Sequence, residues 1–123
     1  MNSKVILVAD DEPPILRSLS FVLKKEGYQV VEARDGTQVV ELLQKGVQPD
    51  LVFLDVMMPK MDGFQVCKWM RSNPQWKNVH IIFLTAKGQN SDRQKGLILG
   101  GNEYITKPFS PSKLIQRVRE IFS

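Results

Sequence analysis

The stretch Leu51-Val52-Phe53-Leu54-Asp55-Val56-Met57-Met58-Pro59 decides the fold of this chain. Four consecutive apolar residues are typical of a strand that is buried on both faces, as in a parallel sheet. A carboxylate follows these residues directly, and a charge at the end of a buried strand needs a partner. The stretch therefore predicts a central strand that ends in a functional carboxylate.

Similar apolar runs are spaced along the rest of the chain. They lie at residues 5–9, 28–33, 80–84 and, as a shorter run, 103–105. Segments with helical periodicity lie between them; the first has apolar residues at 15, 16, 19, 22 and 23 and ends at Gly27. Regular alternation of strands and helices predicts an α/β protein with one parallel sheet that helices cover on both faces.

The composition is that of one globular domain spanning residues 1–123. The chain is 42% hydrophobic and 24% charged, with a net charge of +4. Its apolar runs are shorter than a membrane span and its start does not resemble a secretory signal, so we expect a cytoplasmic protein without membrane contact. The basic residues are not interleaved with aromatics as in a nucleic-acid groove, so no direct nucleic-acid binding is expected. The single cysteine, Cys67, is expected to be a buried thiol.

Polar residues follow four of the predicted strands. Ligands of doubly wound parallel sheets bind beyond the carboxyl ends of the strands, where the strand order reverses. The residues at these ends are Asp10-Asp11-Glu12, Asp55, Thr85-Ala86 and Thr106-Lys107-Pro108. Gathered carboxylates repel one another, and hard oxygen ligands with no histidine or cysteine nearby favour Mg²⁺. A carboxylate is also a competent nucleophile for phosphoryl transfer, so the pattern predicts a magnesium-dependent phosphate site.

Each of these residues also has a purely structural interpretation. An aspartate directly after a strand, such as Asp10 or Asp11, is often a helix N-cap. Thr85 alone would be a strand-end hydroxyl, and Lys107 alone a surface lysine. Only their joint placement favours a site.

Four segments taken together resemble the signature of the response regulator receiver domain of two-component signalling. They are Asp10-Asp11, residues 55–63, Leu84-Thr85-Ala86 and residues 104–109. The resemblance covers essentially the whole chain, in the right order and spacing. It implies a CheY-like, doubly wound (βα)5 flavodoxin-like three-layer sandwich with strand order 2-1-3-4-5.

The resemblance also implies a role for each matching residue. Asp55 would be the phosphoacceptor, and Mg²⁺ would be held by Asp10, Asp11, Asp55 and the backbone carbonyl of Met57. Contacts to the phosphoryl group are implied for two side chains and two backbone groups, those of Lys107, Thr85, Val56 and Ala86. Thr85 and Tyr104 would be the switch pair, and the bond before Pro108 would be cis. The protein would accept and lose a phosphoryl group without being an enzyme toward other substrates.

The expected partners follow from the same resemblance. A sensor histidine kinase or phosphotransfer protein would donate the phosphoryl group, and an output domain or target protein would read the face formed by the fourth helix, strand 103–105 and the last helix. On that face, either one of Ile98 and Leu99 faces solvent and offers an apolar contact to a partner, or both pack on the sheet. A homodimer through this face is also expected from the family pattern, although Lys113 stands where dimerising receivers usually carry an acid.

Two departures from the family pattern carry expectations of their own. Met57 and Lys87 cannot orient an attacking water as an acid or amide could, so we expect a long-lived phosphoryl group, which fast decay of the phosphorylated protein would refute. The loop Gly100-Gly101-Asn102-Glu103 replaces the commoner Gly-Ala-Asp-Asp and is expected to be more flexible and less acidic.

Other functional classes fit the sequence less well. A hydrolase acting on external phosphate esters would need a second acid or base near Asp55, which Val56 and Met57 do not supply. A nucleotide- or flavin-binding module would need glycines in the first loop, where the chain has an acidic, proline-containing segment at 10–14. A receiver excised from a larger, DNA-binding regulator and a phosphorylation-independent interaction module remain open alternatives.

Overall fold

Side chains that alternate along the strands build two hydrophobic layers, one on each face of a five-stranded parallel sheet. A computed structural model describes residues 4–86 and 90–123 of the chain. The strands are ordered β2-β1-β3-β4-β5, and every neighbouring pair is parallel. The predicted fold class and strand order are therefore confirmed.

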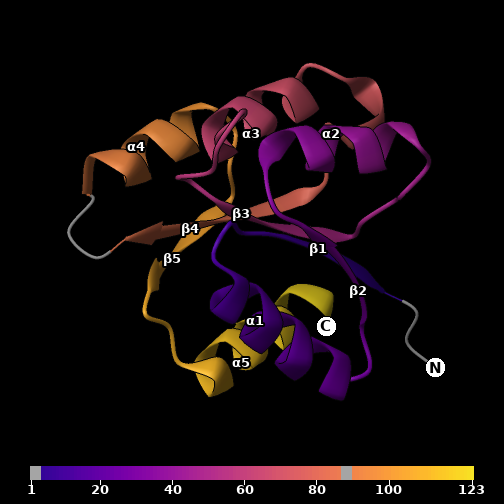
Figure 1. Ribbon diagram of the computed structural model, residues 1–123, viewed down its shortest axis with the longest axis vertical. Coiled ribbons are helices and arrows are strands. Elements are labelled where there is room, and N and C mark those ends of the chain that lie inside the picture. The colour runs from indigo at the N-terminus through magenta and orange to yellow at the C-terminus, as the bar shows by residue number, and fades with distance from the viewer. Residues whose placement is uncertain (1–3, 87–89) are drawn as a thin grey trace.

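The elements alternate as the sequence predicts, with one added 3₁₀ turn, η1. In chain order they are β1 (Val5–Ala9), α1 (Pro13–Lys25), β2 (Gln29–Ala33), α2 (Gly36–Gln44), β3 (Leu51–Asp55), α3 (Gly63–Arg71), η1 (Pro74–Trp76), β4 (His80–Ala86), α4 (Asn90–Ile98), β5 (Glu103–Lys107) and α5 (Pro111–Phe122). Helices α2, α3 and α4 cover one face of the sheet, and α1 and α5 cover the other (Figure 1).

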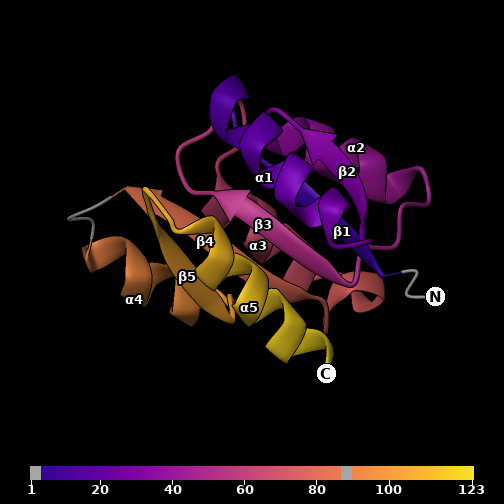
Figure 2. The same ribbon diagram turned by 90° about the horizontal axis from the view of Figure 1, so that it is seen from below.

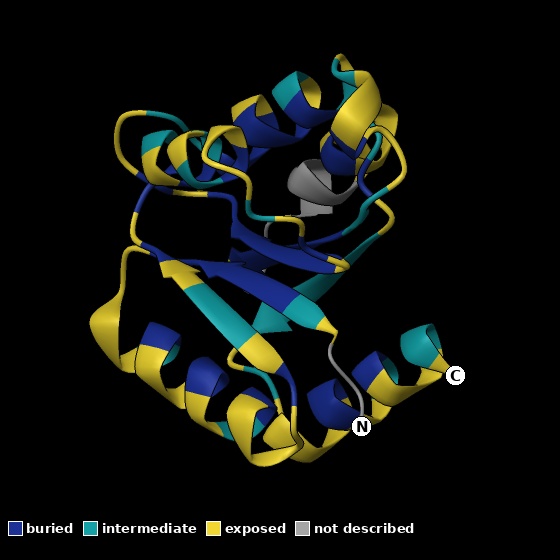
Figure 3. Ribbon diagram, turned by 90° about the vertical axis from the view of Figure 1, so that its right-hand side faces the viewer, coloured by how far each residue is buried: buried dark blue, intermediate teal, exposed yellow. Residues whose placement is uncertain are grey.

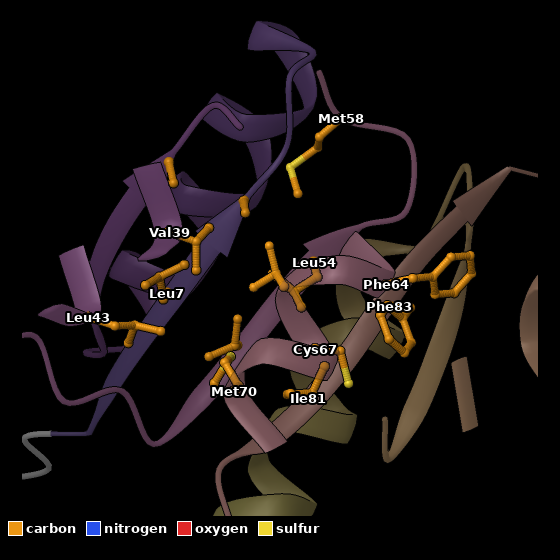
Figure 4. Packing of buried hydrophobic residues seen from close by; sticks show 14 of the residues in the cluster. Leu7, Val39, Leu43, Leu54, Met58, Phe64, Cys67, Met70, Ile81 and Phe83 are labelled. Atoms are coloured by element: carbon orange, nitrogen blue, oxygen red, sulfur yellow. The ribbon is translucent and has the colours of Figure 1, made fainter. Parts of the chain in front are cut away.

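The central strands divide their apolar side chains between the two layers. In β1, Leu7 and Ala9 face α2 and α3, whereas Ile6 and Val8 face α1 and α5. The first layer also contains Phe64, Cys67 and Met70 of α3, and Figure 4 shows them packed against the side chains of β3 and β4. Figure 3 shows the buried residues concentrated in the sheet and on the inner sides of the helices. Burial on both faces explains why these strands are apolar without a polar alternation.

Local signals fix the ends of the helices. Helix α1 ends at Lys25, and Gly27 follows with a φ of +98°, a conformation that glycine adopts without steric cost. Helix α3 begins with a capping box, in which the Asp62 side chain accepts from the Gln65 N–H and the Gln65 side chain accepts from the Asp62 N–H.

Strands β4 and β5 are longer than the apolar pattern predicts. The prediction ended them at Leu84 and Ile105, but the parallel ladder continues to Ala86 and Lys107. The polar residues at these positions pair through their backbones, which hydrophobicity alone does not register. Thr85 and Lys107 are therefore held by the sheet itself and not by the loops that follow it.

The loop before β5 is tied down on the side of α3. The Arg71 guanidinium donates to the carbonyls of Gly100, at 2.8 Å, and Trp76, at 3.1 Å, and to Asn102 Oδ1, at 3.0 Å. Asn102 Oδ1 also accepts from the Ile81 N–H at 2.8 Å. These bonds hold a loop for which the two glycines predicted greater flexibility.

A large ring occupies the space that a glycine of α4 and a glycine of the following loop leave. A Cβ added at Gly101 would collide with the ring of Phe83, and one added at Gly96 would lie 2.6 Å from the same ring. Phe83 also packs edge-on against Phe64, with ring centroids 5.3 Å apart. Gly101 is thus required for close packing, a role that its place in a loop did not predict.

Helix α4 buries little of its apolar surface. Ile98 is 83% exposed, whereas Leu99 packs against the layer on the α3 side. Of the two alternatives, the one in which a residue faces solvent is confirmed for Ile98, and the one in which both pack on the sheet is wrong. Cys67 is buried, as predicted, with its Sγ 3.6 Å from the Leu99 carbonyl oxygen. Within the described residues, no helix combines the length and the apolar character needed to cross a bilayer.

Candidate functional site

The carboxyl ends of four strands bring the predicted site residues together. Asp55 is the last residue of β3, and Asp10 follows β1. Thr85 is the second-to-last residue of β4, and Lys107 is the last residue of β5. Because the chain crosses from β1 to β2 and then returns to β3 on the other side of β1, the strand order reverses at this edge. The sheet topology therefore places the four side chains where ligands of such folds bind.

Four carboxylates form a compact acidic cluster at this edge. Asp10, Asp11, Glu12 and Asp55 each offer an oxygen, and these oxygens all lie within 4.8 Å of one another. Asp10 and Asp55 are buried, whereas Asp11 and Glu12 are exposed. Neither aspartate caps α1, whose N-cap residue is Glu12, so the helix-cap interpretation of Asp10 and Asp11 is wrong. Asp10 Oδ1 instead accepts from the Glu12 N–H at 2.9 Å.

The Lys107 ammonium lies among these carboxylates. Its Nζ is 2.9 Å from Asp10 Oδ2, 3.4 Å from Asp55 Oδ1 and 3.4 Å from Glu12 Oε1. Burial by itself lowers the pKa of Lys107, but the hydrogen bond to Asp10 and the neighbouring negative charges outweigh burial and raise it. Lys107 therefore stays charged at the centre of the cluster.

One ammonium does not balance the buried negative charge. Burial of the carboxylate, together with the charge of Asp10, raises the pKa of Asp55 to about 7, and Lys107 offsets only part of that effect. A carboxyl with so perturbed a pKa at a strand end is a frequent mark of a functional site. The cluster retains an excess of negative charge that a bound cation would relieve.

The backbone beyond Asp55 differs from the expectation in one respect. The Val56 N–H, predicted to contact a phosphoryl group, donates to the Leu84 carbonyl at 3.0 Å and is therefore used within the fold. The Met57 N–H points to Asp55 Oδ1 at 3.2 Å. Of these two amides, that of Met57 is the one placed to contact a group on Asp55.

The switch residues lie on the α3 side of the sheet. Thr85 is buried, two residues beyond Phe83 and on the same face of β4. Tyr104 pairs with Phe83 across the β4–β5 ladder and packs, half-buried, against that layer. The peptide bond between Lys107 and Pro108 is cis. Lys87, which entered the expectation of a long-lived phosphoryl group, lies outside the described residues.

A cleft of about 410 Å³ opens above the acidic cluster. Asp55, Lys107 and the predicted backbone contact Ala86 line it, together with Glu12, Ile15, Met57 and Pro108. Met57 is 73% exposed at this cleft. The sequence predicts no role for Glu12 or Ile15 at the site. The acidic run at 10–12 could have indicated Glu12, whereas nothing in the sequence marks Ile15 as a cleft residue.

Comparison with known proteins agrees with this arrangement. The family model described as the response regulator receiver domain matches residues 6–119. The probable transcriptional regulator ycf27 of Cyanophora paradoxa is 46% identical over 121 residues, which are 98% of this chain and 49% of that protein. The chain thus spans about half the length of this curated relative.

Solved structures give the same result. The chemotaxis response regulator CheY4 of Vibrio cholerae superposes with a TM-score of 0.90 at 30% identity, over 98% of this chain and 99% of that chain. The receiver domain of the sensor histidine kinase PA1611 from Pseudomonas aeruginosa, solved with a magnesium ion coordinated in its active site cleft, gives a TM-score of 0.86 at 31% identity, over 99% and 100% of the two chains. A matching family model, a matching fold and acidic residues gathered at the switch point of the sheet lead to one conclusion: this chain belongs to the response regulator receiver domain family.

Proposed function

We propose that this receiver domain accepts a phosphoryl group on Asp55 and changes its surface in response. The observation that carries the proposal is the position of Asp55, a buried carboxylate that lies 3.4 Å from the Lys107 ammonium and lines an open cleft. A nucleophile next to a fixed positive charge is what phosphoryl transfer requires, because that chemistry depends mainly on positioning and charge neutralisation.

Magnesium is the cofactor that best fits this site. The four clustered carboxylates supply only oxygen ligands, as Mg²⁺ prefers, and the similar receiver of PA1611 holds a magnesium ion in its cleft. Asp10, Asp11, Asp55 and the Met57 carbonyl would hold the ion in this chain. When bound, Mg²⁺ would neutralise charge on the phosphoryl oxygens.

The chain's own residues account for the remaining chemistry. A carboxylate oxygen of Asp55 attacks the phosphorus of a phosphohistidine, the phosphorus–nitrogen bond breaks, and the imidazole leaves with the electron pair. Lys107 binds a phosphoryl oxygen, and the Met57 N–H and the Ala86 backbone donate to others. Water later hydrolyses the acyl phosphate and restores the carboxylate. The chain is proposed to act on its own aspartate alone, so it is not an enzyme toward other substrates.

The response would pass through β4 and β5. The Thr85 hydroxyl moves toward the new phosphoryl group, and the Tyr104 ring follows, which biases an equilibrium between two arrangements. Both residues lie in strands that border α4, where Ile98 and Leu97 are 83% and 48% exposed. An output domain or target protein would read this α4–β5–α5 face.

The classes of partner are proposed from family membership. A sensor histidine kinase or phosphotransfer protein is the proposed donor. The relative in Cyanophora paradoxa is about twice as long and is named a transcriptional regulator, so an output domain that controls transcription is a proposed partner. A homodimer built on ion pairs is less favoured, because Arg117 already forms a bidentate pair with Glu103 of the same chain, at 2.6 and 2.7 Å.

The experiment is an intact-mass measurement after incubation with acetyl phosphate and Mg²⁺. The native chain should gain one phosphoryl group, and a chelator should abolish the gain. The variant Asp55→Ala should gain none, whereas Glu41→Ala, at an exposed acid on α2, should behave as the native chain does. Equal phosphorylation of the native chain and Asp55→Ala would contradict the proposal.

A further inference from the structure

A pocket lies at the end of the sheet opposite to Asp55. Its volume is about 470 Å³, and its walls come from the segments that precede β3 and β4, residues 43–49 and 75–79. Figure 2 shows the arrowhead of β3, which marks the carboxyl end of that strand, and this amino-end pocket belongs to the other end. It shares no residue with the cleft above Asp55. Small-molecule sites have volumes of roughly 300–1,000 Å³, so the pocket is large enough for a ligand.

Buried apolar residues and exposed amides together line the amino-end pocket. Leu43, Pro49 and Trp76 are buried. Three exposed glutamines also line it: Gln44, Gln48 and Gln75. The amides of these glutamines form no hydrogen bond with a described residue, so each offers a donor and an acceptor. No charged residue of the described chain lines the pocket. These features suit an uncharged ligand that both donates and accepts hydrogen bonds.

The buried tryptophan of this pocket contributes a further donor. Trp76 is 8% exposed, and its indole N–H forms no hydrogen bond with a described residue. Its ring is stacked on that of Trp69, with centroids 4.9 Å apart and an angle of 26° between the planes. The indole N–H of a buried tryptophan usually has a partner. A carbonyl oxygen or ring nitrogen of a ligand would supply one here.

Hydrogen bonds hold both walls of the amino-end pocket in place. On one wall, the Arg71 guanidinium donates to the Trp76 carbonyl at 3.1 Å. On the other, the chain turns at Gly46, with a φ of +110°, and the Val47 N–H donates to the Leu42 carbonyl at 3.1 Å. A ligand that enters a preformed site orders few additional groups, which favours its binding.

A second pocket adjoins the first and offers a carboxylate. Its volume is about 290 Å³, and the two pockets share Pro49, Gln75 and Val79. Asp50 lines only the second pocket. Its Oδ2 accepts from the Val5 N–H at 2.8 Å, which orients the carboxylate, whereas Oδ1 forms no hydrogen bond with a described residue. Dinucleotide-binding folds hold a ribose hydroxyl with a carboxylate in the same way.

We propose that these two adjoining pockets bind a nucleoside, with its base in the amino-end pocket and its ribose in the second pocket. The base is flat and uncharged, and its polar edges match the glutamine amides and the Trp76 N–H. The ribose hydroxyls would donate to Asp50. A purely hydrocarbon ligand would cover these polar groups without hydrogen-bonding them, which is unfavourable. A nucleotide is disfavoured as well, because its phosphate would meet the Asp50 carboxylate and no cation among the described lining residues.

The test is a titration of isotope-labelled protein with adenosine and with uridine, followed in proton–nitrogen correlation spectra. The indole resonance of Trp76, identified by its absence in Trp76→Phe, should shift saturably, whereas the amide resonance of Asp55 should not move. Adenosine monophosphate should bind at least about threefold more weakly than adenosine, because of its charge. The proposal would be overturned if neither nucleoside gave a saturable shift, or if the monophosphate bound more tightly than adenosine.

A pair of glutamine variants tests the position of the base. Gln75→Ala should weaken adenosine binding by about threefold or more, since it removes a hydrogen-bonding group from the pocket. Gln116→Ala, at an exposed glutamine of α5 that lines neither pocket, should leave the affinity within about twofold. Equal losses in the two variants would contradict binding at this site.

A pair of acid variants tests the position of the ribose. Asp50→Asn should weaken adenosine binding by about tenfold and leave the binding of adenine, which has no ribose, unchanged. Glu41→Gln neutralises an exposed acid of α2 that lines neither pocket and should affect neither ligand. An equal loss for adenine and adenosine in Asp50→Asn would overturn the placement of the ribose. Asp55→Ala should bind adenosine as the native chain does, so failure of the proposed phosphorylation and failure of this inference are distinguishable.

Discussion

Buried or half-buried carboxylates lie at both ends of the sheet, and the two groups of charges differ in how completely they are matched. At the start of β5, Glu103 receives two hydrogen bonds from Arg117, at 2.6 and 2.7 Å, and lies 2.6 Å from His80 Nε2 at the start of β4. Hydrogen bonds from Arg117 outweigh burial and hold the pKa of Glu103 below its ordinary value.

The cluster at the other end lacks this balance. Asp10, Asp55 and Glu12 share the Lys107 ammonium, and burial with the charge of Asp10 raises the pKa of Asp55 to about 7. A charged carboxylate therefore stabilises the fold at one end of the sheet and destabilises it at the other. Unmatched charge at the carboxyl end suits the proposed binding of a cation and a phosphoryl group, at a cost to the stability of the free protein.

The largest effect on stability is expected at the matched cluster. Glu103→Gln removes the charge that Arg117 and His80 face and should lower the free energy of unfolding by about 1–3 kcal/mol, the usual contribution of charge-assisted hydrogen bonds. Urea denaturation measures this change. Glu120→Gln is the control, because that carboxylate is exposed and makes a single bond to Arg117, at 3.1 Å. A loss as large in the control would show that Arg117 does not anchor chiefly on Glu103.

An effect of opposite sign is expected at the unmatched cluster. In the presence of a chelator at pH 7.5, Asp55→Asn removes a buried charge that its neighbours disfavour, and the melting temperature should rise by about 2–5 °C. Glu41→Gln should leave it unchanged, because Glu41 is exposed and lies away from the cluster. A melting temperature that falls in Asp55→Asn would mean that the pair with Lys107 outweighs the repulsion by Asp10.

The smallest effect is the dependence of stability on pH, which should have opposite signs for the two clusters. Between 3.8 and about 7, native Asp55 retains a proton that the unfolded chain has lost, so stability falls as pH rises through this range. Below 4.5, the unfolded chain takes up a proton at Glu103 that the native chain still resists, so stability falls as pH decreases.

The melting temperature measured against pH in a chelator, for the native chain and the two variants, separates these contributions. Asp55→Asn should flatten the decline toward neutral pH, and Glu103→Gln should flatten the decline at acid pH. If both variants flattened the same side, the assignment of opposite pKa shifts would be refuted.

The sequence predicted the fold and the location of the site for identifiable physical reasons. Strands that are buried on both faces are continuous apolar runs in the sequence, and this pattern predicts the sheet. A parallel sheet brings the carboxyl ends of its strands to one edge, which predicts that Asp10, Asp55 and Lys107 lie close together. Hydrophobicity could not show that β4 and β5 continue through polar residues, because their last pairs are held by backbone hydrogen bonds.

Contacts between residues that are distant in the chain could not be predicted from the sequence. The pairing of Glu103 with Arg117 links a strand to a helix 14 residues later, and no local period marks it. The hydrogen bond from the Val56 N–H to the Leu84 carbonyl depends on the register of β3 against β4. The amino-end pocket combines residues 43–49 with residues 75–79, and only the packing of the folded chain brings these two segments together.

The three hydrogen bonds that Arg71 donates have a consequence for how α4 can move. They fix the carbonyl of Gly100 and the side chain of Asn102, directly beyond the last turn of α4, to α3 and to the end of η1. The C-terminal end of α4 is thus held in place by these hydrogen bonds. We therefore expect a change in the orientation of this helix to pivot on its C-terminal turn. The amide protons near Leu99 and Gly100 should then exchange with solvent more slowly than those nearer the start of the helix.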